Sequence, residues 1–271
     1  MSNTPPRASD AGIVRFERRG TTAVITFERP SARNAMTWSM YEQLDQALDR
    51  VASEPDLRVA VLRGAGGHFV AGTDIAQFVS FTSGEDGVAY ERRLEPVIAK
   101  LESLHVVTVA AVEGYAVGSG MVLATACDLR VSTPDARFGV PIAKTLGNCL
   151  SLANYARLVA VLGVSRTKAM LLTADLMSAE EACAFGFVLD VIEPDTFDSR
   201  LDALCTRVAA NAPITLQVTR EAVRRIVSRS FGDDGDGSID EHLVHRAYGS
   251  RDFREGVAAF IAKRTPRWEG R

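Results

Sequence analysis

Short apolar runs alternate with amphipathic stretches over the first two thirds of the chain. Short runs that are β-branched or alternate in polarity predict strands, and they occur at residues 13–18, 23–27, 59–62, 106–112, 127–132 and 187–192. Apolar residues at helical spacing predict helices, and they occur at residues 38–53, 88–104, 121–126, between 151 and 172, and from 178 to about 185. Such alternation is typical of an α/β fold.

From residue 194 onward the apolar spacing is helical, with interruptions at Pro213 and at the glycine- and aspartate-rich run 232–237. An α/β core followed by a helical segment is therefore expected. Residues 77–87 are polar and contain glycine, which predicts a mobile flap ahead of the helix that begins at 88. The expected divisions are a disordered leader at 1–11, a core at 12–193 and a C-terminal helical segment at 194–271.

The centre of the chain is the apolar run at 106–112, which leads through Glu113-Gly114 into a second apolar run at 121–126. The first run predicts a buried strand and the second a buried helix. Gly118 and Gly120 lie in the turn between them, where the lack of a side chain lets a ligand approach the backbone. The first amides of a helix have no intrahelical acceptor and lie at the positive end of its dipole. This turn is therefore suited to hold an oxyanion.

Composition limits the classes of function. With 271 residues, 46% of them hydrophobic and 24% charged, the chain can bury the core of one soluble domain, with or without a helical appendage. Its net charge of −3 gives no basis for binding nucleic acid or an anionic membrane. Four cysteines without paired spacing favour reduced thiols and a cytoplasmic location. We expect no secretory signal in the polar first ten residues, and no apolar run approaches the roughly 20 residues of a membrane span.

No metal site is expected. The run 234–238 resembles a calcium-binding loop, but Ile239 stands where that loop needs glycine, which favours a solvated loop. His242 and His245 lie three residues apart on an expected helix without a third ligand nearby. His68 precedes an expected strand and could act as a general base, although a packing or surface role fits better.

Six segments carry a family resemblance. They are Glu28-Arg-Pro-Ser-Ala-Arg-Asn-Ala-Met36, His68-Phe-Val-Ala-Gly-Thr-Asp-Ile75, Glu113-Gly-Tyr-Ala-Val-Gly-Ser-Gly120, Ala126-Cys-Asp-Leu-Arg130, Ala136-Arg-Phe-Gly139 and Phe253-Arg-Glu-Gly-Val-Ala-Ala-Phe-Ile-Ala-Lys263. In this order, over residues 12 to 268, the chain resembles the crotonase (enoyl-CoA hydratase/isomerase) superfamily. The resemblance implies an α/β core built as a spiral of ββα turns, with a C-terminal helical segment that forms a trimer or a dimer of trimers.

The resemblance also implies a site for an acyl-CoA thioester. The backbone N–H groups of Thr73 and Ser119 take the positions of an oxyanion hole, which polarises a thioester carbonyl. The resemblance implies no cofactor beyond the coenzyme A of the substrate. The positions that it implies for binding substrate or coenzyme A are Arg29, Arg33, Ala71, Gly72, Asp74, Ile75, Gly118, Gly120, Phe260 and Lys263.

The sequence departs from the family at the groups that hydrate a double bond. Hydratases of the family carry two glutamates, and here Val122 and Ile142 stand at those positions. Neither side chain can carry a proton, so paired-carboxylate hydration is not expected. A buried structural cysteine fits Cys149 better than a nucleophile. The polar residues of this segment are Lys144, Thr145, Asn148, Cys149 and Ser151.

The sequence thus favours an acyl-CoA enzyme of the lyase or isomerase type. In it the oxyanion hole stabilises a thioester enolate, and a group other than glutamate, or none, moves protons. Two alternatives stay open: a non-catalytic acyl-CoA binder or assembly subunit, and another crotonase reaction such as isomerisation, hydrolysis or decarboxylation.

Overall fold

The computed structural model describes residues 11–230 and 241–271, so most of the predicted leader and the run 232–237 lie outside the described residues. A six-stranded sheet has the order β1-β2-β3-β4-β6-β9, and a three-stranded sheet has the order β5-β7-β8. In the large sheet β1 and β2 form an antiparallel hairpin, and the other neighbours are parallel. The strands are β1 (Ile13–Arg19), β2 (Thr22–Glu28), β3 (Val59–Gly64), β4 (Val107–Val112), β5 (Tyr115–Val117), β6 (Leu129–Ser132), β7 (Arg137–Gly139), β8 (Met177–Ser178) and β9 (Asp190–Val191).

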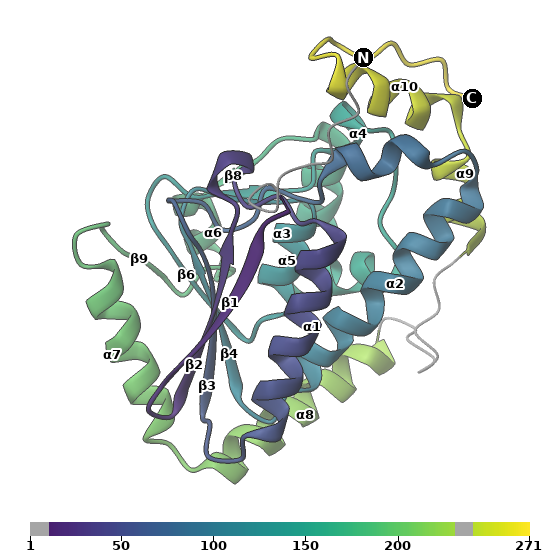
Figure 1. Cartoon of the computed structure of the whole chain (residues 1–271). Helices are drawn as coiled ribbons and strands as arrows, with labels where there is room; N and C mark the ends of the chain where they lie inside the picture. The colour runs from purple at the N-terminus through teal and green to yellow at the C-terminus, as the bar shows by residue number, and fades with distance from the viewer. Residues whose placement is uncertain (1–10, 231–240) are drawn as a thin grey trace.

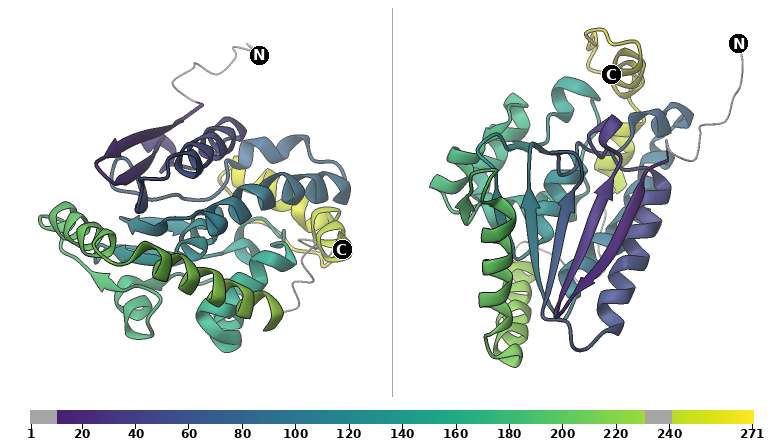
Figure 2. Two further views of the ribbon diagram at one scale, coloured as in Figure 1. Left: turned by 90° about the horizontal axis from the view of Figure 1, so that it is seen from below. Right: turned by 60° about the vertical axis from the view of Figure 1, so that its left-hand side comes forward.

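Helices cover both faces of the large sheet (Figures 1 and 2). The α-helices are α1 (Trp38–Ser53), α2 (Gly84–Ser103), α3 (Ser119–Ala126), α4 (Ile142–Thr145), α5 (Leu152–Thr173), α6 (Ala179–Ala184), α7 (Phe197–Ala209), α8 (Pro213–Ser230), α9 (Glu241–Tyr248) and α10 (Arg251–Ile261). Two 3-10 helices are η2 (Pro30–Ala32) and η3 (Ile75–Ser80). Figure 2 shows α1 on one side of the sheet and α7 on the other.

Alternation along the central strands explains the two layers, because successive strand residues point to opposite faces of a sheet. Along β3, Ala60 and Leu62 belong to the larger core cluster, which includes residues of α1, α2 and α3. Val59 and Val61 face the other way into a smaller cluster with residues of α7. The strands are thus buried on both faces, as expected for parallel strands between helices.

Three local predictions are wrong. Residues 77–87 form no irregular flap, because η3 buries Phe78 against the ring of Tyr90 and α2 begins at Gly84 behind a capping box made by Ser83 and Asp86. The strand expected at 187–192 is reduced to β9, since Phe187 and Val188 are both buried and their amides both bond to the carbonyl of Ala182 in a turn after α6. Residues 137–139, where the sequence predicted no strand, form β7.

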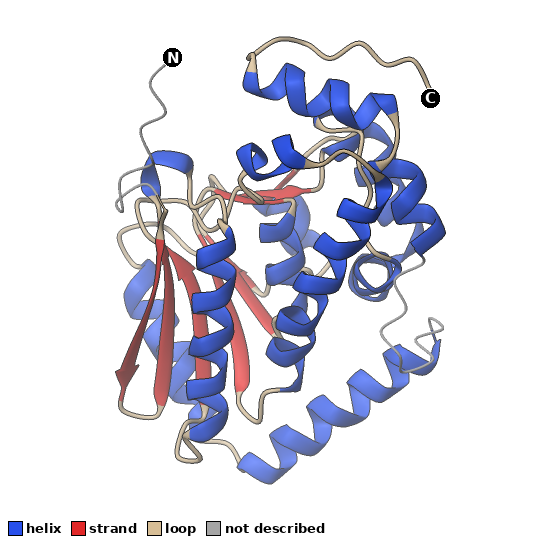
Figure 3. Ribbon diagram, turned by 45° about the vertical axis from the view of Figure 1, so that its right-hand side comes forward, coloured by secondary structure: helices blue, strands red, loops and turns tan. Residues whose placement is uncertain are grey.

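The helical segment from residue 194 divides its apolar residues between core and surface. Leu201, Leu204 and Val208 of α7 are buried against the sheet. By contrast α8 buries no residue and lies along one end of the molecule (Figure 3). One anchor of α8 is Arg220, whose Nε lies 2.7 Å from Oδ2 of Asp128. Among the described residues no helix is both long and apolar enough to cross a membrane.

Candidate active site

A pocket of about 710 Å³ opens where η2, the start of η3, the start of α3, α4 and the C-terminal helices meet. Its wall gathers most of the predicted site positions from segments far apart in the sequence. The predicted residues that line it are Arg29, Arg33, Ala71, Gly72, Thr73, Asp74, Ile75, Gly118, Ser119, Ile142, Phe260 and Lys263.

Two backbone turns in the pocket wall pack closely against each other. An isolated bridge pairs Val70 with Ala116, through hydrogen bonds of 2.9 Å from the Val70 N–H to the Tyr115 carbonyl and 3.0 Å from the Val117 N–H to the Val70 carbonyl. Gly118 has φ 58° and ψ −120°, a conformation that favours glycine. A Cβ on Gly118 would lie 3.4 Å from Cα of Gly72. Residues 71–73 and 117–119 therefore lie side by side.

Both predicted amide donors fall in these turns. Thr73 pairs with Met36 in a parallel bridge, whose hydrogen bonds use the carbonyl of Gly72 and the N–H of Asp74 on either side of Thr73. The bridge therefore leaves the Thr73 N–H unused. Ser119 is the first residue of α3, where backbone N–H groups lack an intrahelical acceptor. Both amides can thus donate to an oxygen in the pocket.

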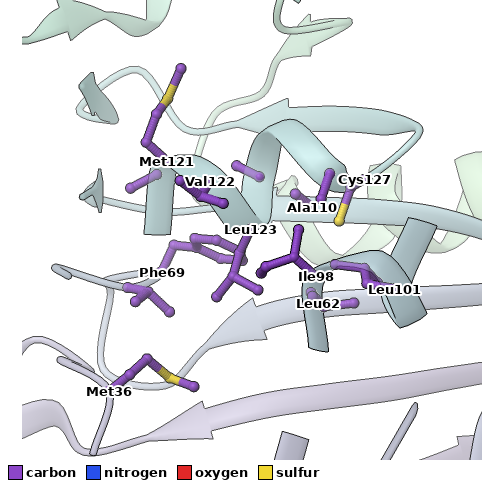
Figure 4. Packing of buried hydrophobic residues seen from close by; sticks show 14 of the residues in the cluster. Met36, Leu62, Phe69, Ile98, Leu101, Ala110, Met121, Val122, Leu123 and Cys127 are labelled. Carbon is purple, nitrogen blue, oxygen red and sulfur yellow. The ribbon is translucent and has the colours of Figure 1, made fainter. Parts of the chain in front are cut away.

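Neither Gly120 nor Val122 lines the pocket, although both were predicted at the site. Gly120 packs against the chain behind it, because a Cβ there would lie 2.0 Å from the Val70 carbonyl oxygen. Val122 is 5% exposed and lies among buried side chains such as Leu123 (Figure 4). Of Val122 and Ile142, the two residues that the sequence predicts at the glutamate positions, only Ile142 belongs to the pocket wall.

A buried carboxyl group that the sequence analysis missed lies in the same wall. Glu91 of α2 lines the pocket and is only 3% exposed. The Tyr248 hydroxyl donates to Oε1 of Glu91 at 3.1 Å, and Nδ2 of Asn148 donates to the Tyr248 hydroxyl at 3.0 Å. Loss of solvation raises the pKa of Glu91 to about 7. Its place three residues from both Val88 and Leu94, on the apolar face of the helix, was a signal in the sequence.

Hydroxyl groups surround the Thr73 side chain. Its Oγ1 lies 2.7 Å from the hydroxyl of Tyr41 and 2.9 Å from that of Tyr90. Burial raises the pKa of Tyr41 to about 12, so the phenol stays neutral and can only share its proton in hydrogen bonds. These contacts fix the turn that carries the Thr73 amide.

The loop before α1 is fixed by a residue that sequence reasoning also missed. The fully buried Asn34 accepts a hydrogen bond from the Arg29 N–H at 2.7 Å and donates to the carbonyls of Ala65 and His68. It therefore ties residues 29–36 to the segment that follows β3. The adjacent carbonyl of Arg33 accepts from the N–H of Ala71 at 3.1 Å, which places this loop over the amide turn.

Three predicted basic residues lie at the mouth of the pocket but differ in their contacts. Arg29 is paired, with Nη2 2.8 Å from Oδ2 of Asp74. The exposed Arg33 holds its guanidinium 5.0 Å from the centre of the Tyr115 ring. Lys263 follows α10 and is exposed, as is Phe260. Arg33 and Lys263 are therefore better placed than Arg29 to meet an anionic group.

The sequence favoured packing roles for Cys149 and His68, and the structure places Cys149, partly exposed, in the pocket wall and His68 outside it. Cys149 lines the pocket, but burial raises its thiol pKa to about 12, so the nucleophilic thiolate is disfavoured. His68 lies outside the pocket wall, with its ring 5.4 Å from that of Tyr115. Within residues 11–230 and 241–271 no group of three or more histidine, cysteine or acidic residues could hold a metal ion.

A family model described as enoyl-CoA hydratase/isomerase matches residues 17–271. The chain belongs to this family. Family membership confirms the resemblance drawn from the six segments and identifies a crotonase-family enzyme.

Relatives match this family member over nearly their whole length. The short-chain-enoyl-CoA hydratase of Clostridium acetobutylicum is 29% identical over 250 residues, which cover 92% of this chain and 94% of the relative. An enoyl-CoA hydratase/carnithine racemase from Magnetospirillum magneticum is 30% identical, with 96% of each chain covered and a TM-score of 0.76. A methylmalonyl-CoA decarboxylase in complex with 2-nitronate-propionyl-CoA is 24% identical, with 96% and 99% covered and a TM-score of 0.84. The last likeness concerns the fold, which confirms the predicted α/β crotonase architecture.

Proposed function

We propose that the protein binds acyl-CoA thioesters and stabilises a thioester enolate with the backbone N–H groups of Thr73 and Ser119. The observation that carries this proposal is the close packing of the two turns, which leaves both amides at the bottom of one pocket. Preorganised donors aimed at a developing negative charge are commonly the largest contribution to such catalysis.

The polarity of the pocket supports a thioester with an acyl chain inside and coenzyme A at the mouth. Many side chains of the wall are apolar, while Arg33 and Lys263 are exposed and could meet the phosphates of an anionic nucleotide. Arginine and lysine are the residues that commonly bind phosphate. The apolar residues of the wall include Ile75, Phe78, Ile142, Leu146, Leu150 and Leu176.

The reaction that we propose is proton transfer at the acyl chain rather than addition of water. The names of relatives favour hydration, but the apolar side chains of Val122 and Ile142 cannot supply the acid and base that hydration requires. The second candidate is a non-catalytic acyl-CoA binder, which the same two apolar residues favour. Turnover of a panel of CoA thioesters separates the two candidates, since both would bind coenzyme A.

Binding is the first expected result. Isothermal calorimetry with acetyl-, crotonyl- and octanoyl-CoA should show binding in the micromolar to millimolar range. Lys263→Ala should weaken it by about 3-fold to 10-fold, the effect of an exposed charge contact of roughly 0.6–1.4 kcal/mol. Lys168→Ala, which removes an exposed lysine of α5 outside the pocket wall, is the matched control and should bind normally. No heat of binding at millimolar ligand would refute the proposal.

We also propose that copies of this chain associate through α8, as a trimer or a dimer of trimers. Apolar side chains exposed over one helix are unusual on a monomer, and a second copy is the partner that the family resemblance implies. The exposed apolar residues of α8 are Ile214, Val218, Val223 and Ile226.

Light scattering at micromolar concentration should give about three or six times the 29.3 kDa of one chain. The double variant Val218→Glu with Ile226→Glu should lower that mass, because it places charge at two separate turns of the exposed apolar face. Thr219→Glu, an exposed polar position on the same helix, should leave the mass unchanged. A wild-type mass near one chain would contradict the assembly.

A further inference from the structure

We propose that Glu91 is the catalytic group that moves protons to and from the acyl chain, from a helix that carries neither of the two glutamate positions of the hydratases. The inference rests on the proposed function, because it assumes a thioester held by the Thr73 and Ser119 amides. It replaces the expectation from the sequence that no glutamate takes part. The substrates that it implies are unsaturated acyl thioesters whose double bond shifts between neighbouring positions.

The first support is the place of Glu91 in the pocket. Glu91 and Asp74 are the acidic residues of the described pocket wall, and Asp74 is held by Arg29 at 2.8 Å. Glu91 lies one residue after Tyr90, whose hydroxyl contacts Thr73 at 2.9 Å. The carboxyl group therefore belongs to the same wall as the turn that carries the Thr73 amide.

The second support is the absence of a cation beside Glu91. The next carboxyl group along the same face of α2, Glu95, forms an ion pair with Nη2 of Arg157, and Glu102 lies 2.9 Å from Nε of the same arginine. Among the ion pairs of the described residues Glu91 has none. A buried carboxyl without a cation is costly as an anion, and such groups are concentrated at functional sites.

The third support is the way in which Glu91 is held. Tyr248 donates to it from α9, while Ser151, which is fully buried, contacts it through side chain and backbone. Asn148 in turn donates to Tyr248, and its own Oδ1 is buried without a hydrogen-bond partner among the described residues. These contacts come from two separate segments and orient the carboxyl group without neutralising its charge.

The surroundings of Glu91 keep its proton exchangeable near neutral pH. Loss of solvation is the largest effect and raises its pKa to about 7, while the hydrogen bond from Tyr248 lowers it and the charge of Glu95 raises it. At this value both the acid and the base form are populated, as a group that takes and returns a proton requires. The titratable groups that interact with it are Tyr41 of α1, Tyr90 and Glu95 of α2, Cys149 before α5, Tyr155 of α5 and Tyr248 of α9.

The chemistry balances with a single carboxyl group. The Glu91 carboxylate removes a proton from the α-carbon of a 3-enoyl thioester, and the electron pair of the C–H bond moves toward the carbonyl to give a dienolate. The negative charge on oxygen is stabilised by the two amides. The Glu91 carboxylic acid then returns the proton to the γ-carbon, and a 2-enoyl thioester results. No water, oxidant or second acid is consumed, which agrees with the apolar Ile142 in the wall.

The test uses the full-length protein with 3-butenoyl-CoA and trans-3-hexenoyl-CoA, followed by the absorbance of the 2-enoyl thioester and by deuterium incorporation in D2O. The wild type should isomerise at least one of them, with a rate that rises with pH through about 7 because the carboxylate is the base.

Glu91→Gln should lower the rate by about 10²-fold to 10⁴-fold. Its affinity for the saturated butyryl-CoA, measured by calorimetry, should change by less than about 3-fold, which also shows that the variant is folded. Glu91→Asp should retain partial activity, and Tyr248→Phe should shift the pH profile.

Glu102→Gln is the matched control, because Glu102 lies on the same helix outside the pocket wall. It should isomerise as the wild type does.

A Glu91→Gln variant that isomerises at the wild-type rate would overturn the role of Glu91 and leave the proposed function intact. A wild type that binds butyryl-CoA but neither isomerises nor exchanges protons would overturn the proton-transfer role and favour the non-catalytic binder. If Glu91→Gln fails to fold, the pH profile of the wild type and the rate of Glu91→Asp decide: a flat profile with full activity of the aspartate variant refutes the proposal.

Discussion

Purified protein is expected to hydrate crotonyl-CoA at least about 10⁴-fold more slowly than a family hydratase that carries both carboxylates. Positioned acid and base groups each contribute about 10²-fold to 10⁴-fold, and the residues that we propose at the two positions, Val122 and Ile142, are both apolar. Spectrophotometric loss of the conjugated thioester, with the Clostridium acetobutylicum short-chain-enoyl-CoA hydratase assayed beside it, measures the difference. Equal rates for the two enzymes would show that Val122 and Ile142 do not stand where the two glutamates act.

Glutamate can also be introduced at Ile142 or Val122, and we expect different effects on stability at the two positions. Ile142 is in the pocket wall, so Ile142→Glu can reach solvent and should leave the free energy of unfolding nearly unchanged. Val122 is 5% exposed in the core, so Val122→Glu buries a carboxyl group among apolar side chains and should destabilise the fold by roughly 2–4 kcal/mol. We expect Ile142→Glu alone to leave hydration slow, because Val122, at the other proposed glutamate position, stays apolar and Glu91 enters the pocket wall from a different helix. Denaturant unfolding of both variants provides the stability comparison.

The layers of the fold could be predicted because the strands alternate with the period of a sheet. In β3 the four apolar residues 59–62 point in turn to the two core clusters. Thr37 likewise has the side chain of an N-cap, and its Oγ1 accepts from the N–H of Met40. These signals are local, since each depends on residues close together in the sequence.

Tertiary contacts explain part of what the sequence did not predict. Residues 77–87 contain two aromatic residues among polar ones, and both Phe78 and Phe81 pack against the rings of Tyr90 and Tyr248. Strand β5 is only three residues long and exists because β7 pairs with it. Tyr248 and β7 lie far from these segments in the sequence, whereas the capping box of Ser83 and Asp86 was a local signal.

The part of the candidate site that consists of backbone turns could be predicted from the sequence motifs. The motifs locate the two turns, and the structure brings them together through the bridge between Val70 and Ala116. They do not locate Glu91, because its role depends on α9 and on the segment before α5 closing over α2. The sequence signal for Glu91 was a charged residue on the apolar face of a helix. That signal does not distinguish a buried carboxyl group with a structural role from one that transfers protons.

Removal of the Ser119 backbone N–H should also cause a large loss of rate. Ser119→Pro removes the N–H that the proposal assigns to the thioester oxygen. Proline is tolerated at the first position of a helix, because its ring suits the helical φ and the lost N–H had no intrahelical acceptor. Loss of one such donor typically lowers the rate by about 10²-fold to 10³-fold. Proton exchange of a bound 3-enoyl-CoA in D2O should therefore fall by that factor, while circular dichroism and the thermal midpoint stay close to the wild type.

Ser119→Ala separates the backbone group from the side chain at the same position. The Ser119 hydroxyl is buried near the Tyr41 hydroxyl but forms no hydrogen bond of regular geometry among the described residues, so its removal should cost little stability. Because the amide remains, the alanine variant should exchange protons within about 3-fold of the wild-type rate. An alanine variant as slow as the proline variant would assign the effect to the hydroxyl, and a proline variant with the wild-type rate would show that the Ser119 amide does not bind the thioester oxygen. Either result would remove Ser119 from the proposed pair of donors and leave Thr73 as the remaining candidate.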